Sequence, residues 1–398
     1  MSKLLAQKKH ELIRTFFQHA EESDDERNLK DYEAYFNTFD TELNVLNSHE
    51  TYFRLKLEVN TEQMAGIVLR AIPAIQQSPD ATQRSILKSL HLDLQRLRQD
   101  LQQDLNNEQW ALLLGEEEGE KPALELALDS VVRLWLMIDP SCRNGQDDIH
   151  RAGWRGDRQF CDFVHTQFYP CQPATAQEIT QEERQANDRE LAADMMAETM
   201  QVQSNLTHPL TAANMKKLTN IAIKWVSLLD EHLEFDADIR ELSIFHHNRW
   251  LLDALFMVQA WENESPQRQF CPFPIPRDVL EETIKSLNLL FPPYNKPTTR
   301  FLAKNNMNLL EFRLRGHGQA RNRAGSKTRL REFTFYHDRL IELAQEFISP
   351  PKDWSTIFRD YRNPIQYWTF WLGLVIFIAT VASVGLGGAQ VYYAQHAT

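Results

Sequence analysis

A cluster of acidic residues around one histidine is the constellation in this sequence that could carry the most chemistry. Its members are Asp230, Glu231, His232, Glu234, Asp236 and Asp238. Carboxylates and an imidazole can supply a general acid and base, or hard oxygen ligands for a cation. The spacing is not that of an EF-hand, and a solvated helix end followed by a polar turn accounts for the same residues. We favour this structural interpretation, so no catalytic residue is identified.

A second cluster combines thiols and imidazoles: Cys142, His150, Cys161, His165 and Cys171. Cys161 and His165 would lie one helical turn apart, a spacing that can share a metal. The cluster lacks the paired short spacings of structural zinc sites, so buried thiols and surface imidazoles are the favoured interpretation. We predict no metal and no cofactor.

Two adjacent histidines, His246 and His247, end a segment whose alternation is typical of a β-strand. Neighbouring side chains of a strand point to opposite faces, so we expect these two to have structural roles and not to act on one substrate.

A basic segment stands out because the chain has a formal net charge of −12. Between residues 313 and 331 there is no Asp or Glu, and the basic side chains are Arg313, Arg315, Arg321, Arg323, Lys327, Arg329 and Arg331. Each such charge near a membrane adds about 1 kcal/mol of attraction to anionic lipid. Binding of lipid or of a partner, and simple solvation, are both open interpretations. The overall acidity argues against nucleic acid as a partner.

The C-terminal region contains an apolar segment with no Asp, Glu, Lys or Arg after residue 362. As a helix, residues 367–389 would extend about 35 Å, enough to cross ~30 Å of hydrocarbon. The leucine, isoleucine, valine and phenylalanine side chains of residues 368–388 contribute roughly −3 to −6 kcal/mol to insertion. Aromatic residues typical of membrane interfaces flank the segment: Tyr367, Trp368, Trp371, Tyr392 and Tyr393. We predict one transmembrane helix, with a buried core helix as the alternative.

Flanking charges predict the orientation of this helix. Lys352, Arg359 and Arg362 precede it and no basic residue follows it, so the positive-inside rule places the N-terminal body in the cytosol. The N-terminal sequence lacks the apolar core of a secretory signal. The span ends so near residue 398 that the ribosome would release the chain before the helix emerged, so we expect insertion to follow translation, as in a tail-anchored protein. The absence of basic residues after the span favours the endoplasmic reticulum or another endomembrane.

Small residues recur every four positions within the predicted span, at Ala379, Ser383 and Gly387. Such a stripe lets a second helix approach closely and would support a homo-oligomer. Ordinary glycine usage in transmembrane helices accounts for it equally well.

Composition predicts a mainly α fold, because the 398 residues include only 13 glycines. The 4 cysteines form no C-x-x-C pair, which suits a reducing compartment. We predict two helical domains, the second with a short β-hairpin, and one C-terminal transmembrane helix. The boundaries are an N-terminal domain at 1–171, a polar acidic linker at 172–206, a second domain at 207–350, a juxtamembrane segment at 351–366, the span at 367–389 and a tail at 390–398.

Apolar periodicity and capping residues predict the individual elements. The clearest pattern is the leucine repeat from Leu87 to Leu105. The hairpin is expected around the polar turn 236–240. Helices are expected at 3–19, 30–57, 86–105, 123–138, 157–168, 211–230, 249–262, 277–290 and 331–348.

The end of the chain resembles a group of uncharacterised ascomycete fungal proteins. In that group a D-x-R-N-x-x-Q-aromatic-aromatic-T-F-W segment opens a terminal membrane span. The matching residues here are Asp360, Arg362, Asn363, Gln366, Thr369, Phe370 and Trp371, followed by Ala389, Gln390, Val391 and Tyr392. The sequence departs from the pattern at Pro364. The resemblance implies the topology and a fungal source, and no activity.

Three functions are compatible with these observations. The leading hypothesis is a non-enzymatic interaction or scaffold module that is anchored in a membrane, faces the cytosol and binds a protein partner. The second is an enzyme with a site between the domains that uses His232 and neighbouring carboxylates. The third is a membrane-perturbing effector of incompatibility or cell death that acts through its N-terminal helices.

Overall fold

The computed structural model describes part of the chain, and every structural statement below refers to that part. The described residues are 6–17, 29, 32–49, 60–78, 80–90, 123–140, 154, 157–168, 197, 199–206, 208–264, 273–292, 295–305, 330–349 and 364–396.

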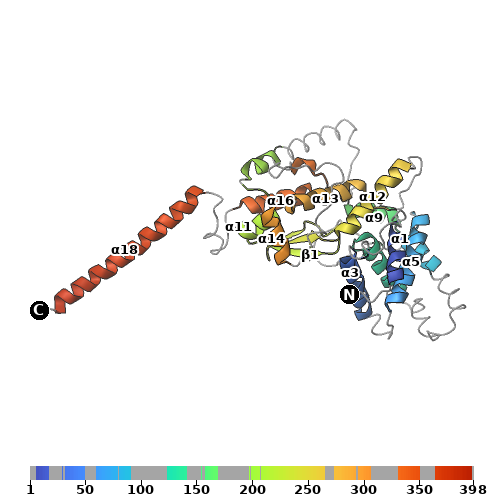
Figure 1. Cartoon of the computed structure of the whole chain (residues 1–398), viewed down its shortest axis with the longest axis horizontal. Helices are drawn as coiled ribbons and strands as arrows, with labels where there is room; N and C mark the ends of the chain where they lie inside the picture. The colour runs from blue at the N-terminus through green and yellow to red at the C-terminus, as the bar shows by residue number, and fades with distance from the viewer. Residues whose placement is uncertain are drawn as a thin grey trace.

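The fold is mainly α, as predicted, and Figure 1 shows its helices gathered in a body from which one long helix projects. The helices are α1 (Ala6–Phe16), α3 (Glu33–Ser48), α5 (Thr61–Gln77), α8 (Ala123–Leu136), α9 (Phe160–Phe168), α11 (Ala212–Leu218), α12 (Asn248–Glu264), α13 (Arg277–Leu290), α14 (Lys296–Lys304), the short 3-10 helix η2 (Leu330–Glu332), α16 (His337–Ile348) and α18 (Pro364–His396). The strands are β1 (Ala222–Val226), β2 (Phe235–Asp236) and β3 (Glu241–Phe245).

Local sequence signals define several helix starts. Asn60 and Gln63 form a reciprocal capping box that starts α5. Asn295 accepts a hydrogen bond from the backbone N–H of Thr298 and so caps α14. Thr211 caps α11 in the same way through the N–H of Asn214, at 3.3 Å. Polar residues with short side chains thus satisfy N–H groups that the helices leave unpaired.

The sheet has the strand order β1-β3-β2. β2 and β3 are antiparallel and form the predicted hairpin. Its turn is held by Asp236, whose Oδ1 accepts from the N–H groups of Asp238 and Ile239 at 3.0 and 3.1 Å. β1 pairs with β3 in parallel, with Ala222 opposite Glu241.

The predicted helix 211–230 is wrong beyond its first two turns. α11 ends at Leu218, and Asn220 adopts a left-handed φ of 56° that no α-helix tolerates. Residues 222–226 then form β1 instead of continuing the helix. Ile223, Trp225 and Val226 suit a strand, and the pairing partner lies nearly twenty residues further along the chain.

Other predicted helices are placed correctly with shifted ends. The helix expected at 30–57 is α3, which ends at Ser48, and residues 50–59 lie outside the described part. Of the helix expected at 86–105, residues 83–90 are described and helical, with Ile86 and Leu90 buried. The helix expected at 331–348 is divided into η2 and α16.

The predicted linker 172–206 contains a packed helical end. Residues 199–205 are helical, and Thr199 and Val202 are buried. Thr199 Oγ1 lies 2.7 Å from Nε2 of His337 at the start of α16. This end of the predicted linker therefore belongs to the body.

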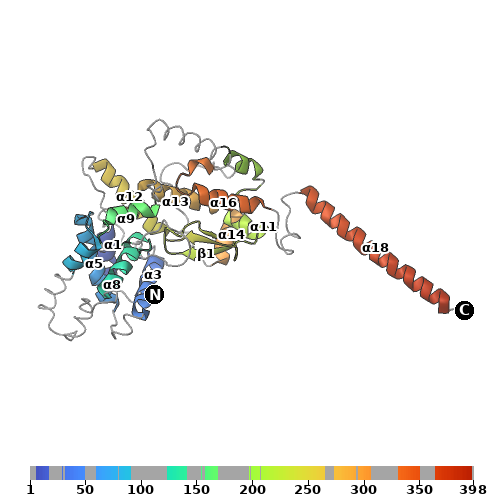
Figure 2. The same cartoon turned by 180° about the vertical axis from the view of Figure 1, so that it is seen from behind.

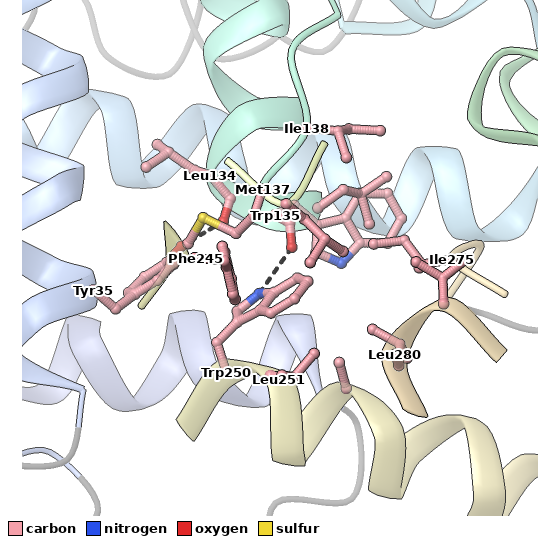
Figure 3. Packing of buried hydrophobic residues seen from close by; sticks show 14 of the residues in the cluster. Tyr35, Leu134, Trp135, Met137, Ile138, Phe245, Trp250, Leu251, Ile275 and Leu280 are labelled. Carbon is pink, nitrogen blue, oxygen red and sulfur yellow. Dashed lines mark hydrogen bonds between the residues drawn. The ribbon is translucent and has the colours of Figure 1, made fainter. Parts of the chain in front are cut away.

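Residues from both predicted domains contribute to one hydrophobic cluster. Figure 3 shows two hydrogen bonds inside it. The Tyr35 hydroxyl donates to the Leu134 carbonyl at 2.8 Å, and Trp250 Nε1 donates to the Trp135 carbonyl at 3.1 Å. Trp135 lies at the end of α8 and Trp250 in the first turn of α12. The division into domains 1–171 and 207–350 stays a prediction, but their side chains share this core.

Candidate functional sites

The terminal helix α18 is the part of the structure with the clearest functional consequence. It contains the stretch Tyr367–Tyr392, which is long and apolar enough to cross a membrane. None of the residues in the most apolar 18-residue part of this stretch is buried by the described body. Figures 1 and 2 show it leading away from the body in both views. Its large side chains are exposed, for example Val384 at 70 % and Leu386 at 68 %. A helix of this kind needs an apolar environment that the described body does not provide.

The observed span is slightly longer than predicted. Pro364 occupies the first helical turn, where its missing N–H removes no hydrogen bond, and the helix continues to His396. Most of the predicted tail 390–398 is thus helical. Near the N-terminal end, the Tyr367 ring lies 5.8 Å from that of Trp368 and 6.2 Å from that of Trp371. These aromatic rings form a cluster suited to an interface.

The small-residue stripe lies on one face of α18, because its members are four residues apart on a continuous helix. A Cβ added at Gly387 would meet nothing within 4 Å. The predicted role of Ala379, Ser383 and Gly387 in helix contact stays a prediction.

His232 occupies an enclosed position within the body, with 0 % of its surface exposed. Its Nδ1 accepts from the Phe245 N–H at 3.2 Å. Nε2 therefore carries the proton and donates to Ser286 Oγ at 2.7 Å. Ser286 in turn donates to the Thr283 carbonyl at 2.8 Å. The Tyr336 ring meets the imidazole edge-on at 5.1 Å.

The surroundings of His232 keep the imidazole neutral. Burial, with a smaller contribution from the Arg339 charge, lowers its pKa to about 3. Both ring nitrogens are engaged by the protein, and the side chain has no access to solvent. This imidazole therefore cannot take a proton from a substrate near neutral pH, which removes the motive for the enzyme hypothesis based on it.

The carboxylates of Glu234, Asp236 and Asp238 do not converge on His232. Asp236 holds the hairpin turn, and Asp238 is exposed. The Glu234 carboxylate lies 3.6 Å from the guanidinium of Arg339. That guanidinium also donates to the carbonyls of Asp230 and His232. The predicted solvated helix end is wrong, because Asp230, Glu231 and His232 are buried and lie well beyond the end of α11. The polar turn is present, and Asp236 holds it.

A polar cluster forms where β3 leads into α12. His246 Nδ1 donates to the Val226 carbonyl at 2.8 Å. His247 Nε2 lies 3.2 Å from Thr38 Oγ1, which also lies 3.2 Å from Ser227 Oγ. The two imidazole rings are only 4.0 Å apart, centroid to centroid. The expectation that they face opposite sides is wrong, because both residues lie beyond the end of β3.

This cluster resembles a hydroxyl–histidine pair, but it lacks part of what nucleophilic catalysis needs. An activated hydroxyl requires a base whose second nitrogen is oriented by an acceptor. His247 Nδ1 is buried and has no hydrogen-bond partner among the described groups. Burial, with a smaller effect of His246, lowers the His247 pKa well below its usual value. The arrangement joins α3, β1 and α12 and has no feature that points to catalysis.

One important side chain was missed by the sequence prediction. Glu282 of α13 is buried, and its carboxylate accepts from three consecutive N–H groups, those of Thr334, Phe335 and Tyr336, at 2.7, 2.9 and 3.1 Å. Tyr336 immediately precedes α16. The carboxylate thus fixes the turn that starts α16 and satisfies its free donors. Only long-range packing distinguishes Glu282 from its neighbour Glu281.

Several predicted residues lie outside the described part of the chain. They are Cys142, His150 and Cys171 of the thiol cluster, and Arg313, Arg315, Arg321, Arg323, Lys327 and Arg329 of the basic segment. Cys161 is described, and its thiol donates to Asp80 Oδ1 at 3.3 Å. Arg331 is exposed in η2.

Comparisons of the chain with protein-family models, with curated proteins and with solved structures find no match. The resemblance to ascomycete proteins therefore stays a prediction. Functional conclusions rest on the sequence and the geometry alone.

Proposed function

We propose that this protein is a tail-anchored membrane protein whose folded body acts as an interaction module on the cytosolic face of an endomembrane. One observation carries the proposal: α18 is a long apolar helix near the end of the chain, and no residue in its most apolar part is buried by the described part of the protein. In water, each large apolar side chain of this helix forgoes about 1.5–3 kcal/mol of burial energy. Insertion into a bilayer recovers that energy.

The anchor is tested by placing two charges in the middle of α18. Ile376→Asp and Val381→Arg together add about 5–7 kcal/mol to the insertion free energy, which offsets the roughly −3 to −6 kcal/mol from the apolar residues. Both side chains are more than half exposed, so the body is not disturbed. We expect the double variant to be extracted by alkaline carbonate. The matched control, Ile376→Leu with Val381→Leu, stays in the membrane pellet, and extraction of wild type and control would disprove the anchor.

The role as an interaction module is supported by the chemistry of the remaining sites. The histidine considered for catalysis is enclosed by the protein. The basic segment 313–331 concentrates positive charge in an acidic chain and ends at the exposed Arg331. Charge of this kind suits anionic lipid headgroups close to the anchoring membrane.

The same charged double variant allows lipid binding to be measured without the anchor. We expect it to float with vesicles that contain phosphatidylserine and not with neutral vesicles. Adding Arg313→Glu, Arg315→Glu, Arg321→Glu and Arg323→Glu should abolish flotation, because four attractive charges become repulsive. If the four additional substitutions leave flotation unchanged, or if the charged double variant itself does not float, lipid is excluded as the ligand of the basic segment.

A further inference from the structure

A small hollow in the body lies between the start of α3 and the start of α12. Its lining includes Tyr32 and Tyr35 from one side, and His247, Asn248 and Trp250 from the other. It encloses about 10 Å³, close to the minimum of roughly 10–15 Å³ that a single water molecule requires. The hollow is therefore too small for an organic substrate.

Two residues that line this hollow carry three buried polar atoms with no partner among the described groups. They are Nδ1 of His247 and both Oδ1 and Nδ2 of Asn248. The two residues are only 3 % and 2 % exposed. A buried polar group without a hydrogen bond costs about 1–3 kcal/mol, so three together at one site call for a bound partner.

We propose that this hollow binds one ordered water molecule that pairs with His247 Nδ1 and with the carboxamide of Asn248. Water is the ligand whose chemistry fits, because the site presents both a donor, Asn248 Nδ2, and acceptors. A water molecule donates two hydrogen bonds and accepts others, so it satisfies both kinds of atom at once.

Two other ligands fit less well. An anion could accept from Asn248 Nδ2, but it would also face the carbonyl oxygen of the same side chain. A metal ion would need more ligands than the site offers, because the described residues contain no group of three His, Cys, Asp or Glu side chains placed to hold one.

The water would complete a hydrogen-bonded chain across three elements. Ser227 after β1 contacts Thr38 of α3, Thr38 contacts His247, and the water would continue from His247 to Asn248 at the start of α12. Both predicted domains contribute to this chain. The site would therefore help to fix α3 against α12, whatever the partner of the body is.

A structure of the full-length protein in lipidic cubic phase, at better than about 2 Å, tests the proposal directly. We expect a water oxygen about 2.7–3.2 Å from His247 Nδ1 and from one polar atom of the Asn248 side chain. An empty hollow, a different molecule in it, or direct pairing of these atoms with protein groups would overturn the proposal.

A double-mutant cycle gives a second, independent test on the full chain in detergent. His247→Phe and Asn248→Leu each remove one side of the water site, so the melting temperature of the double variant should fall by less than the sum of the two single losses. The matched cycle, Thr211→Ala with Asn248→Leu, should be additive, because Thr211 caps α11 and is not among the residues that line the hollow. Additive losses in the first cycle would count against a shared water.

Discussion

Replacing His232 with glutamine should change how the stability of the body depends on pH. The pKa of His232 is lowered to about 3 in the folded protein, whereas an exposed imidazole has a pKa of about 6.5. Between these values the unfolded chain binds a proton that the folded chain does not. Stability from this group is therefore complete above pH 6.5 and is lost as the pH falls toward 3.

The size of this effect follows from the shift. From pH 7.5 to pH 5, protonation of the unfolded chain at His232 alone removes about 2 kcal/mol from the free energy of unfolding. Glutamine does not titrate, so the His232→Gln variant should lose about 2 kcal/mol less than the wild type over this interval. The variant is also expected to be less stable at both pH values, because glutamine cannot reproduce both hydrogen bonds.

Unfolding of the full-length protein in a nonionic detergent by urea, followed by tryptophan fluorescence at the two pH values, measures the effect. Trp135, Trp154 and Trp250 are buried and report loss of the core. Asn44→Gln serves as the control, because Asn44 is exposed and neither asparagine nor glutamine titrates. An identical pH dependence in wild type and His232→Gln would refute the assignment of a neutral, enclosed imidazole.

Two further predictions concern single side chains that start helices. Glu282→Ala should lower the free energy of unfolding by about 3 kcal/mol, because it leaves three N–H groups before α16 without their acceptor. In the same urea titration, Glu342→Ala on the exposed face of α16 should change this free energy by less than about 0.5 kcal/mol. Thr211→Ala should cost about 1 kcal/mol through loss of the α11 cap, and Thr211→Ser should restore most of it.

The features that the sequence predicted best are those determined by local composition. The span was recognisable because α18 has a long apolar run without Asp, Glu, Lys or Arg and with aromatic ends. The helices α12 and α13 were recognisable because their apolar residues recur with helical spacing. The hairpin was recognisable because a polar turn separates two short apolar segments. None of these depends on a distant partner.

The features that sequence alone could not predict depend on distant partners. β1 is a strand because β3 pairs with it, and its own residues also fit the end of a helix. His232 is enclosed because Ser286, 54 residues away, meets its Nε2. Glu282 is a turn-holding residue only because α16 starts beside it. The acidic residues around His232 suggested general acid–base chemistry. The buried imidazole, with both ring nitrogens hydrogen-bonded, does not support it.

Cell-free synthesis of the full-length chain with microsomes, followed by glycan analysis, is the measurement that most directly tests an anchored protein with a cytosolic body. Asn205 and Asn263 both occur in N-x-S/T sequons and both are exposed, so they report the location of the body. An Asn-Gly-Thr extension added at the C-terminus reports the other side of the membrane. We predict carbonate-resistant chains with a glycan on the extension and none on Asn205 or Asn263. A glycan on either body site, or release of the chain by carbonate, would contradict the proposed topology.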